Sequence, residues 1–567
     1  MFFLSVTNSS ISKNFLSSNL QELRVNSLFL TVMTDDFSKL VTEPDGFSVL
    51  ETSLDSTDFF SKIVYDNKNN TIKVVKSTLS GMPIYYKAEP NGNFFCSSSI
   101  SMLREAGVEI EENTSILPEY FVYFYVSPPD TLYLGIRRLS SGSYLLLELK
   151  ESRCDIKHVK CFAFPEKKQE IHDSMDAISK QVSEHLSKVI RGLEENKDEI
   201  TLLLSGGLDS SILFKLLEKF WDIGATYSSG YSFENPKTNF EKKYALSAKE
   251  YFKTDHMYFE PSTEDFLIGL IEGIQIAEEP ITPQWVLFHL LFKDAIPGDH
   301  KIILCGQGAD IVFGSYRHDL LFEVRNNWGY RLIQNETIIR ILRIAQHITG
   351  NESLKRKLNK LQRLKDDQIW ALDVYADMDW ACEYYKVSEE EINKNRLKII
   401  ELYKDYSIYD VISILNFFGH LCISKSIISK LAEKQGKIII YPYNETEIIR
   451  FSLSLPWEIK PFKNILRHVA RQLGIPEFII TRPKSGIQIR RKDRAEKGGP
   501  FEPLVALASE IFDEEHIRGM QSSDPYKAMT FWCILSYSIW KRLCIDMENP
   551  ASLINELNES IRINKKE

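Results

Sequence analysis

The sequence predicts an α/β protein in two parts, a β-rich N-terminal unit followed by a larger unit built on a parallel sheet. Strand-like segments and turn signals fill the first 164 residues. From residue 165 onward, short apolar strands alternate with amphipathic helices, which is the pattern of a parallel sheet. A chain of 567 residues is long enough for at least two domains with cores of their own. We therefore expect domains at 1–164 and 165–567, with a helical insertion at about 320–410.

The composition of the chain limits the kinds of binding partner that we expect. With 43% hydrophobic and 26% charged residues, the chain has ordinary globular composition. Its net charge of −9 argues against non-specific binding to nucleic acid or an anionic membrane. The apolar runs at 285–292 and 529–540 are too short or too interrupted to span a bilayer. The eight cysteines form no C-x-x-C pair, which favours a reducing, cytoplasmic setting. We expect no nucleic-acid or membrane partner and leave a homodimer open.

The elements of the first unit follow from local signals. Aromatic and β-branched residues predict strands at 93–96, 120–126 and 143–149. Turns are marked at 90–92, where Pro-Asn-Gly stands, and at 140–142, where Ser-Ser-Gly stands. The charged segment 165–200 has apolar residues at helical spacing, so it predicts a linker helix that opens the second unit.

The stretch 201–217 carries the strongest chemical signal. A buried strand at 201–204 and a helix at 212–217 enclose a turn with Gly206 and Gly207, which let the backbone approach a ligand closely. The first turn of the helix offers unpaired N–H groups, and Ser205, Ser210 and Ser211 add hydroxyl groups, so the turn suits a polyanion.

Asp209 is unexpected in such a turn, because a carboxylate repels phosphate unless a cation lies between them. Mg²⁺ bridging carboxylate and phosphate oxygens resolves the conflict. The turn lacks the lysine of a Walker A loop and instead matches the S-G-G-x-D-S loop of enzymes that split ATP between its α and β phosphates.

A second glycine-rich turn follows a later strand. Strands are predicted at 225–231, 256–259 and 301–305, and the last of these runs into Cys305-Gly306-Gln307-Gly308-Ala309-Asp310. In an open α/β sheet, ligands bind at the carboxyl ends of the strands where the strand order reverses. Asp310 is therefore our candidate for the second carboxylate of a magnesium–pyrophosphate site, beside Asp209.

Three runs of the second unit resemble the asparagine synthetase family. They read ILCGQGADIVFGSYRHD, FKNILRHVARQLGIPEFIITRPKSGIQIRR and AMTFWCILSYSIWKRL. The resemblance implies ATP and Mg²⁺ as cofactors, Lys484 as the catalytic residue at the reacting carboxyl-adenylate, and Asp209 and Asp310 as metal ligands. Together with the loop itself, it gives the nucleotide-binding set Leu204, Ser205, Gly206, Gly207, Asp209, Ser210, Ser229, Cys305 and Gly306.

The first unit resembles the glutaminase domain of the same family, a nucleophile-hydrolase fold, in the runs GMPIYYKAEPNGNFFCSSSISML and YLGIRRLSSGSYLLLE. The family's glutaminase uses a cysteine exposed as its first residue, whereas Phe2 stands here and no cysteine precedes Cys96. Its Arg-Asp-x-x-Gly signature reads Lys-Ser-Thr-Leu-Ser-Gly at 76–81. We therefore expect a vestigial domain that does not use glutamine.

The second unit also departs from the family's pattern. Gln307 and Ile311 stand where the family has acidic residues, and these details look more like β-lactam synthetases and lasso-peptide macrolactam synthetases. The tyrosine–glutamate dyad of β-lactam synthetases is not recognisable, since its glutamate falls near Ser426. Glu278 and Glu279 precede a proline where the family's substrate cleft lies, which makes them candidates for substrate contact.

These observations favour a carbon–nitrogen ligase that adenylates a carboxylate, releases pyrophosphate and passes the acyl group to an amine. The carboxylate could belong to a small molecule, a peptide or a glycan. Ammonia-dependent asparagine synthesis and a catalytically inactive nucleotide-binding protein are the alternatives. In the helical insertion, basic residues at 355–365 flank an apolar stripe of Leu354, Leu358 and Leu361. A solvated basic face over a packed stripe competes here with a docking surface for an acidic substrate, such as a peptide leader, a carrier protein or a glycan.

Overall fold

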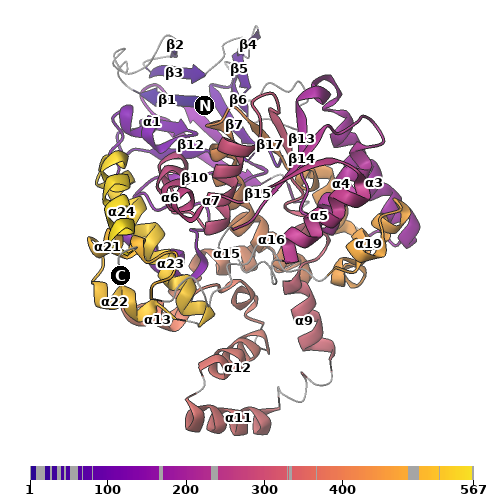
Figure 1. Ribbon diagram of the computed structural model, residues 1–567. Helices are drawn as coiled ribbons and strands as arrows, with labels where there is room; N and C mark the ends of the chain where they lie inside the picture. Colours follow the sequence, from indigo (N-terminus) through magenta and orange to yellow (C-terminus); the bar gives the residue numbers. More distant parts are fainter. Residues whose placement is uncertain are drawn as a thin grey trace.

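The computed structural model describes most of the chain. The described residues are 2–7, 20–25, 28–34, 40–43, 46–50, 62–66, 68–79, 81–161, 163–164, 170–231, 240–327, 330, 335–350, 352–365, 367–482, 497–522 and 524–564. The α/β class is confirmed: antiparallel sheets form the N-terminal unit, and the unit that follows it contains a parallel sheet (Figure 1).

Two antiparallel sheets form the N-terminal unit. Among the described residues, one has the strand order β10-β8-β9-β1-β3-β2 and the other β12-β11-β7-β6-β5-β4. Apolar residues of both sheets, such as Leu4, Tyr86, Val74 and Leu147, share one buried core. The strands are β1 Phe2–Thr7, β2 Leu20–Val25, β3 Leu28–Thr34, β4 Leu40–Glu43, β5 Gly46–Leu50, β6 Lys62–Asp66, β7 Thr71–Lys76, β8 Tyr85–Ala88, β9 Phe94–Ser97, β10 Arg137–Arg138, β11 Ser143–Leu149 and β12 Cys154–Cys161.

Two of the three strands predicted in this unit are confirmed, as β9 and β11. The third is wrong, because residues 117–123 form helix α2 (Leu117–Tyr123). Pro118 and Glu119 occupy its first turn, as helix starts favour, and Phe121 packs edge-on against Trp380 of the second unit. Tertiary packing of a helix between other helices has overridden the local preference of these aromatic residues for a strand.

The second unit is built on a parallel sheet with strand order β15-β14-β13-β16-β17. Its strands are β13 Ile200–Leu203, β14 Ala225–Ser229, β15 Asp255–Phe259, β16 Ile302–Leu304 and β17 Ile438–Ile440. All neighbouring pairs are parallel, and chain order reverses direction between β13 and β16. The carboxyl ends of these two central strands are therefore where a ligand site is expected.

The two faces of this sheet contribute to separate cores. Leu202 and Leu304 belong to a core shared with α3, α4 and α19, whereas Leu203 and Ile303 belong to one shared with α6, α7, α17 and α23. This alternation is what a period of two along each strand dictates. The helices in these layers and at their rim are α1 Ile100–Glu105, α3 Met175–Arg191, α4 Leu208–Leu217, α5 Phe240–Phe252, α6 Thr263–Ala277, α7 Pro283–Leu290, α8 Ala309–Phe313, α16 Ile408–Asn416, α17 Cys422–Glu433, α18 Thr446–Ser454, α19 Asn464–Gln472, α20 Glu477–Ile480, α21 Pro503–Ser509, α22 Glu514–Met520, α23 Pro525–Trp540 and α24 Pro550–Asn564.

One helical run, 408–433, is long and apolar enough to cross a membrane by length and composition alone. It comprises α16 and α17, and 89% of its most apolar window is buried inside the protein. Trp285 and Gln307 both donate to Ser424 on α17, so this run is a central core helix here.

The predicted insertion is a helical arm. Helix α9 (Tyr316–Asn326) leaves the body, α11 (Glu336–Thr349) lies at the far end, and α12 (Glu352–Lys365) returns beside it (Figure 1). The chain then re-enters the body through α13 Met378–Tyr385, α14 Glu389–Ile392 and α15 Lys394–Leu402. The arm is therefore attached to the rest of the protein at the end of α9 and along α12.

Candidate active site

The first loop closes around a glycine that no other residue could replace without strain. Gly206 has a φ of 68°, and a Cβ there would lie 2.2 Å from the carbonyl oxygen of Tyr244. Gly207 is the residue before α4, and Asp209 lies in the first turn of that helix. The Ser205 hydroxyl accepts from the Gly207 N–H at 3.3 Å, which fixes the turn after β13. The strand–turn–helix predicted for 201–217 is confirmed.

The second loop lies directly beside the first. Strand β16 leads into it, and the Cys305 N–H donates to the carbonyl of Ile440 at 2.9 Å. Gly308, with a φ of 98°, precedes α8, and Asp310 lies in that helix's first turn. A Cβ on Gly306 would come within 3.3 Å of the Asp209 Cβ. The two predicted aspartates therefore approach each other from adjacent strand ends.

A third segment, 442–445, ties the two loops together. The Tyr443 hydroxyl donates to the main-chain carbonyl of Asp209 at 2.9 Å. The Asn444 amide donates to the main-chain carbonyl of Gln307 at 3.0 Å. The relative positions of the loops are thus set by side chains that follow β17.

Lys463 joins the two aspartates through one ammonium group. Its Nζ lies 2.7 and 2.6 Å from the two carboxylate oxygens of Asp209 and 2.5 Å from Oδ1 of Asp310. The lysine side chain is 14% exposed. Both Phe462 and Lys463 have positive φ values, 57° and 55°, an uncommon backbone conformation for residues with side chains. This conformation directs the chain before α19 toward the loops.

These residues border a cleft of about 320 Å³ at the carboxyl edge of the sheet. Arg467 on α19 and Arg482 add positive charge to its wall, and Tyr316 and Asp319 on α9 line the opposite part. Arg482 donates to the carbonyl of Ser205 at 3.0 Å and pairs with Glu241 at 2.5 Å. A concave site with two carboxylates and several cations is suited to a multiply charged anion together with a divalent metal ion.

The residues present fit the Mg²⁺ that the family resemblance implies. Asp209 and Asp310 supply hard carboxylate oxygens, and Lys463 shows that one cation reaches both of them. No cluster of three or more His, Cys, Asp or Glu suited to a metal occurs among the described residues. Magnesium is commonly held by one or two carboxylates, with substrate phosphates completing its shell, so two aspartates suffice.

The predicted site residues divide into two groups. Ser205, Gly207, Asp209 and Asp310 line the cleft. The others are not among the lining residues: Leu204 and Gly206 follow β13, Ser210 is on α4, Ser229 ends the neighbouring strand β14, and Cys305 and Gly306 follow β16. Lys484, the predicted catalytic residue, lies outside the described residues. The roles of all these residues stay predictions.

Lys463 and Asp319 also line the cleft, although neither was among the site residues predicted from the sequence. Lys463 stands 254 residues after Asp209, so nothing local indicates that its ammonium reaches the first loop. Asp319 is half-buried, and desolvation raises the pKa of its carboxyl group above its usual range. It accepts from the Phe462 N–H at 2.7 Å, which holds the segment before Lys463 against α9.

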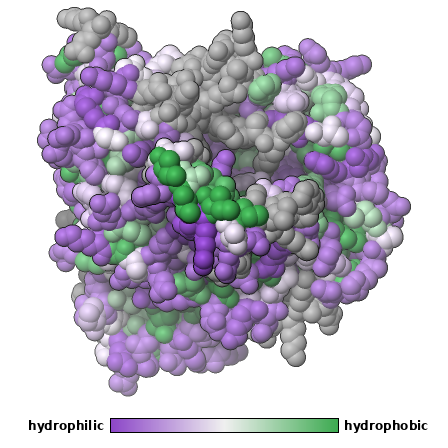
Figure 2. Space-filling view, turned by 90° about the horizontal axis from the view of Figure 1, so that it is seen from below, coloured by the Kyte–Doolittle hydropathy of each residue, from purple (hydrophilic) through white to green (hydrophobic). Residues whose placement is uncertain are grey.

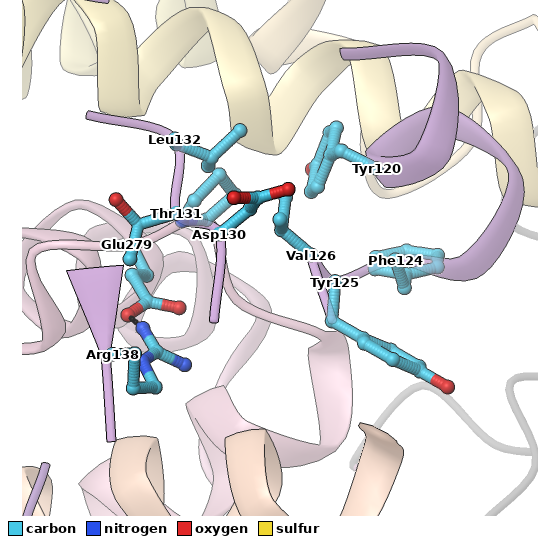
Figure 3. Close-up of a pocket in the computed structure, with 10 residues that line it drawn as sticks. Tyr120, Phe124, Tyr125, Val126, Asp130, Thr131, Leu132, Arg138 and Glu279 are labelled. Carbon is cyan, nitrogen blue, oxygen red and sulfur yellow. Dashed lines mark ion pairs between the residues drawn. The ribbon is translucent and has the colours of Figure 1, made fainter. Parts of the chain in front are cut away.

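Glu278 and Glu279 are not placed for substrate contact, contrary to our expectation. Both are buried between the two units. The Glu278 carboxylate accepts from the N–H groups of Ile100 and Ser101, at 2.8 and 2.7 Å, and thereby caps α1. Glu279 forms an ion pair with Arg138 at a cavity just large enough for one water molecule (Figure 3). These glutamates hold the N-terminal unit onto the second unit.

The segment that replaces the family's glutamine-holding signature is also part of this interface. Lys76 is fully buried and its ammonium lies 3.5 Å from the Ser426 hydroxyl on α17. The Thr78 hydroxyl lies 2.9 Å from that of Thr446. A Cβ on Gly81 would lie 1.9 Å from the Ser429 hydroxyl. Helices α17 and α18 therefore pack directly against the described residues of this segment, 76–79 and 81.

Gln307, which stands where the family has an acidic residue, takes part in a small hydrogen-bond network. Gln307 donates from its amide to the Ser424 hydroxyl at 2.6 Å, and Trp285 donates to the same hydroxyl at 3.2 Å. Within the described part of the chain, the amide oxygen of Gln307 has no hydrogen-bond partner.

The fold and this geometry place the chain among open α/β proteins whose ligand site lies at the switch point of a parallel sheet. The family model described as asparagine synthase matches residues 181–532, and one described as a glutamine amidotransferase domain matches residues 51–158. The first match spans more than half of the chain. The chain belongs to the asparagine synthase family.

Individual relatives are distant. The putative asparagine synthetase [glutamine-hydrolyzing] 2 of Methanocaldococcus jannaschii is 23% identical over 53% of this chain and 56% of its own length. Asparagine synthetase [glutamine-hydrolyzing] 1 of Bacillus subtilis is 19% identical over 76% of this chain and 67% of its own. The microcin J25-processing protein McjC of Escherichia coli is 23% identical over 51% and 52%. The chain thus spans about half the length of several curated relatives that it matches.

Proposed function

We propose that the protein is an ATP-dependent amide-forming ligase. It adenylates a substrate carboxylate, with release of pyrophosphate, and transfers the acyl group to an amine that does not come from glutamine. The observation that carries the proposal is the bridge formed by Lys463 between Asp209 and Asp310 at the switch point of the sheet. Membership of the asparagine synthase family supports ATP as the nucleotide.

The residues around the cleft have distinct parts in this proposal. Asp209 and Asp310 would hold Mg²⁺, which supplies charge neutralisation at the phosphates when it is bound. The N–H groups at the start of α4 would face the same anion, and Lys463 would exchange the carboxylates for a phosphate oxygen when the metal binds. Arg467 and Arg482 keep positive charge at the cleft wall. Lys484 remains our candidate for stabilising the oxyanion formed when the amine attacks.

The proposal that glutamine is not the nitrogen donor is supported by the interface. Residues 76–79 and 81 lie against α17, and Lys76 and Lys425 are both buried there. Lys425 donates to the carbonyl of Thr78, and burial lowers the pKa of its ammonium group to about 7. A pocket for glutamine beside this segment would have to displace packed side chains of the second unit. Release of glutamate from glutamine by the purified protein, above a heat-treated control, would contradict this part of the proposal.

The names of the relatives favour one second candidate, asparagine formation from aspartate and free ammonia. Gln307 weighs against this second candidate, because a neutral amide stands where the family has a negatively charged carboxylate. The experiment is to incubate the protein with Mg²⁺, a panel of carboxylates and amines that includes aspartate with ammonium, and ATP labelled at the α-phosphorus in one sample and at the γ-phosphorus in a parallel one. AMP and pyrophosphate in equal amounts support the ligase, and the active pair identifies the product. ADP and orthophosphate would refute the reaction class.

A further inference from the structure

The far end of the arm carries two parallel stripes of side chains that the rest of the protein leaves uncovered. Ile341, Ile344 and Ile348 follow one another at three- and four-residue steps, so they lie on one face of α11. Their exposed fractions are 59%, 61% and 77%. Seen from below, at the far end of the arm, the surface over α11 shows a compact apolar patch with hydrophilic neighbours (Figure 2).

The second stripe is basic. Arg340, Arg343 and His347 each precede one of the three isoleucines, which places them about 100° around the helix, beside the apolar stripe. All three are exposed, and in the described part of the chain no ion pair involves any of them. Glu336 is the one acidic residue among 336–349. The outer surface of α11 is therefore apolar and cationic, on a chain whose net charge is −9.

The basic residues of α12 differ from those of α11 because three of them form ion pairs. This difference bears on the two interpretations of the basic segment of α12, a solvated face or a docking surface. Lys355 pairs with Asp379 at 3.0 Å, Arg356 pairs with Asp377 at 3.3 Å, and Arg363 pairs with Glu389. The apolar side of α12 is packed, as the buried Leu358 and Leu364 show. The ion pairs of Lys355, Arg356 and Arg363 thus attach α12 to the body, whereas the described residues provide no such partner for the basic residues of α11.

We propose that this surface of α11, defined by residues 340–348, docks an acidic, apolar polypeptide segment. As a substrate-docking surface it rests on the proposed ligase function; as a binding surface it does not. Isoleucines at helical spacing accept the apolar side chains of an amphipathic helix, and the adjacent arginines match its carboxylates. The segment would belong to the polypeptide whose carboxylate or amine is joined in the cleft.

The arm's position supports a substrate role. Tyr316 and Asp319, at the start of α9, line the cleft, and α9 carries the chain eleven residues, or about 16 Å, toward the arm. An extended stretch of about ten residues spans about 30 Å. A segment held on α11 can therefore leave its reactive end in the cleft while the docked part stays outside.

Two other occupants fit less well. In a twofold pairing of α11 with a second copy, Arg340 and Arg343 would meet their own counterparts, and like charges at such a contact repel. A membrane surface would be met by a single 14-residue helix, which has none of the Trp, Tyr or Phe side chains that anchor interfacial helices. The acidic polypeptide is the occupant that both stripes favour.

The test uses the full chain and a fluorescent 18-residue helical peptide with leucines at three- and four-residue steps and glutamates beside them. Fluorescence anisotropy should detect binding that weakens at least tenfold in Ile344→Glu/Ile348→Glu and in Arg340→Glu/Arg343→Glu. Ile563→Glu, at an exposed isoleucine on α24, is the matched control and should bind as the wild type does. A peptide with lysines in place of the glutamates should prefer the Arg340→Glu/Arg343→Glu variant.

Equal binding by wild type and both arm variants would overturn the proposal. So would an arm-dependent dimer in sedimentation velocity, or arm-dependent binding to vesicles of phosphatidylcholine and phosphatidylglycerol without peptide binding. Magnesium pyrophosphate binding should be unchanged in the arm variants, since no arm residue reaches Asp209 or Asp310. If the wild type does not bind magnesium pyrophosphate, the proposed function is contradicted, whereas the proposal of a docking surface on α11 is not.

Discussion

Replacing Lys463 with methionine should destabilise the protein and at the same time create a stronger site for a free metal ion. The ammonium lies within 2.7 Å of both carboxylate oxygens of Asp209 and 2.5 Å from Asp310. Methionine keeps most of the side-chain length and removes the charge. Two carboxylates that shared a cation then face each other without one, and like charges at this separation repel.

The size of the effect follows from exposure. The side chains of Lys463, Asp209 and Asp310 are 14%, 22% and 30% exposed, so the pairs are partly solvated. Exposed ion pairs contribute about 0–1 kcal/mol, and removing one partner of a fully buried pair costs about 3–5 kcal/mol. For two partly exposed pairs on one ammonium we expect a loss of about 1–3 kcal/mol in the free energy of unfolding. Lys293→Met, which removes an exposed ammonium 2.8 Å from Glu272, should cost less than about 1 kcal/mol.

The assay is thermal and urea unfolding with and without Mg²⁺, followed by calorimetric titration. In the wild type, Lys463 competes with Mg²⁺ for the carboxylates, so Mg²⁺ alone should stabilise it little. In Lys463→Met, millimolar Mg²⁺ should recover part of the lost stability, since a ligand that binds only the folded state stabilises it. The reasoning fails if Lys463→Met is as stable as Lys293→Met, or if Mg²⁺ stabilises the wild type and the variant equally.

Three further predictions test the loop, the buried histidines and the catalytic candidate. Gly206→Ala adds a Cβ 2.2 Å from the Tyr244 carbonyl at positive φ and should cost at least about 2 kcal/mol, whereas Gly474→Ala, at φ 72° with open space around it, should cost about 1 kcal/mol; equal urea midpoints would contradict this. Burial lowers the pKa of each of three histidines, His256, His318 and His420, from 6.5 to about 4. Between pH 6.5 and 4 the unfolded chain therefore binds more protons than the folded protein, and the free energy of unfolding in urea should fall as the pH drops, by up to about 3 kcal/mol for each histidine. A free energy of unfolding that does not change over this pH range would refute the prediction. Lys484→Met should slow product formation about 10²–10³-fold and retain ATP–pyrophosphate exchange; a change in product formation below about threefold would exclude this role.

Local sequence signals were sufficient for the strand–loop–helix elements of the site. The apolar run before Ser205, the two glycines and the amphipathic segment after Asp209 each impose a local backbone preference, and β13 and α4 follow them. The same applies to the turn that carries Asp310 after β16. The parallel order of these strands then brings both aspartates to one edge, as alternation of strands and helices predicted.

Long-range packing decided what the sequence could not show. Residues 120–126 have a strand-like composition, but α2 is stabilised by aromatic contacts with elements more than 250 residues away, such as Trp380 and Tyr537. Glu278 and Glu279 look like exposed acids before a proline, and only the fold reveals their partners in the N-terminal unit. On the arm, the sequence directed attention to the basic residues of α12 and not to those of α11. Ion pairs with distant parts of the chain determine which basic side chains are left to bind a partner, and the sequence does not show these pairs.

The central claim is that two aspartates on adjacent strand ends form a magnesium–pyrophosphate site, and calorimetric titration of the purified protein with pyrophosphate tests it without knowledge of the substrate. The account predicts binding by the wild type in the presence of Mg²⁺, loss of most of that binding when EDTA removes the metal, and at least tenfold weaker binding by Asp310→Asn and by Asp209→Asn. Asp405→Asn, at an exposed aspartate away from the cleft, should bind as the wild type does. Wild-type binding that is independent of Mg²⁺, or that survives unchanged in both cleft variants, would contradict the account.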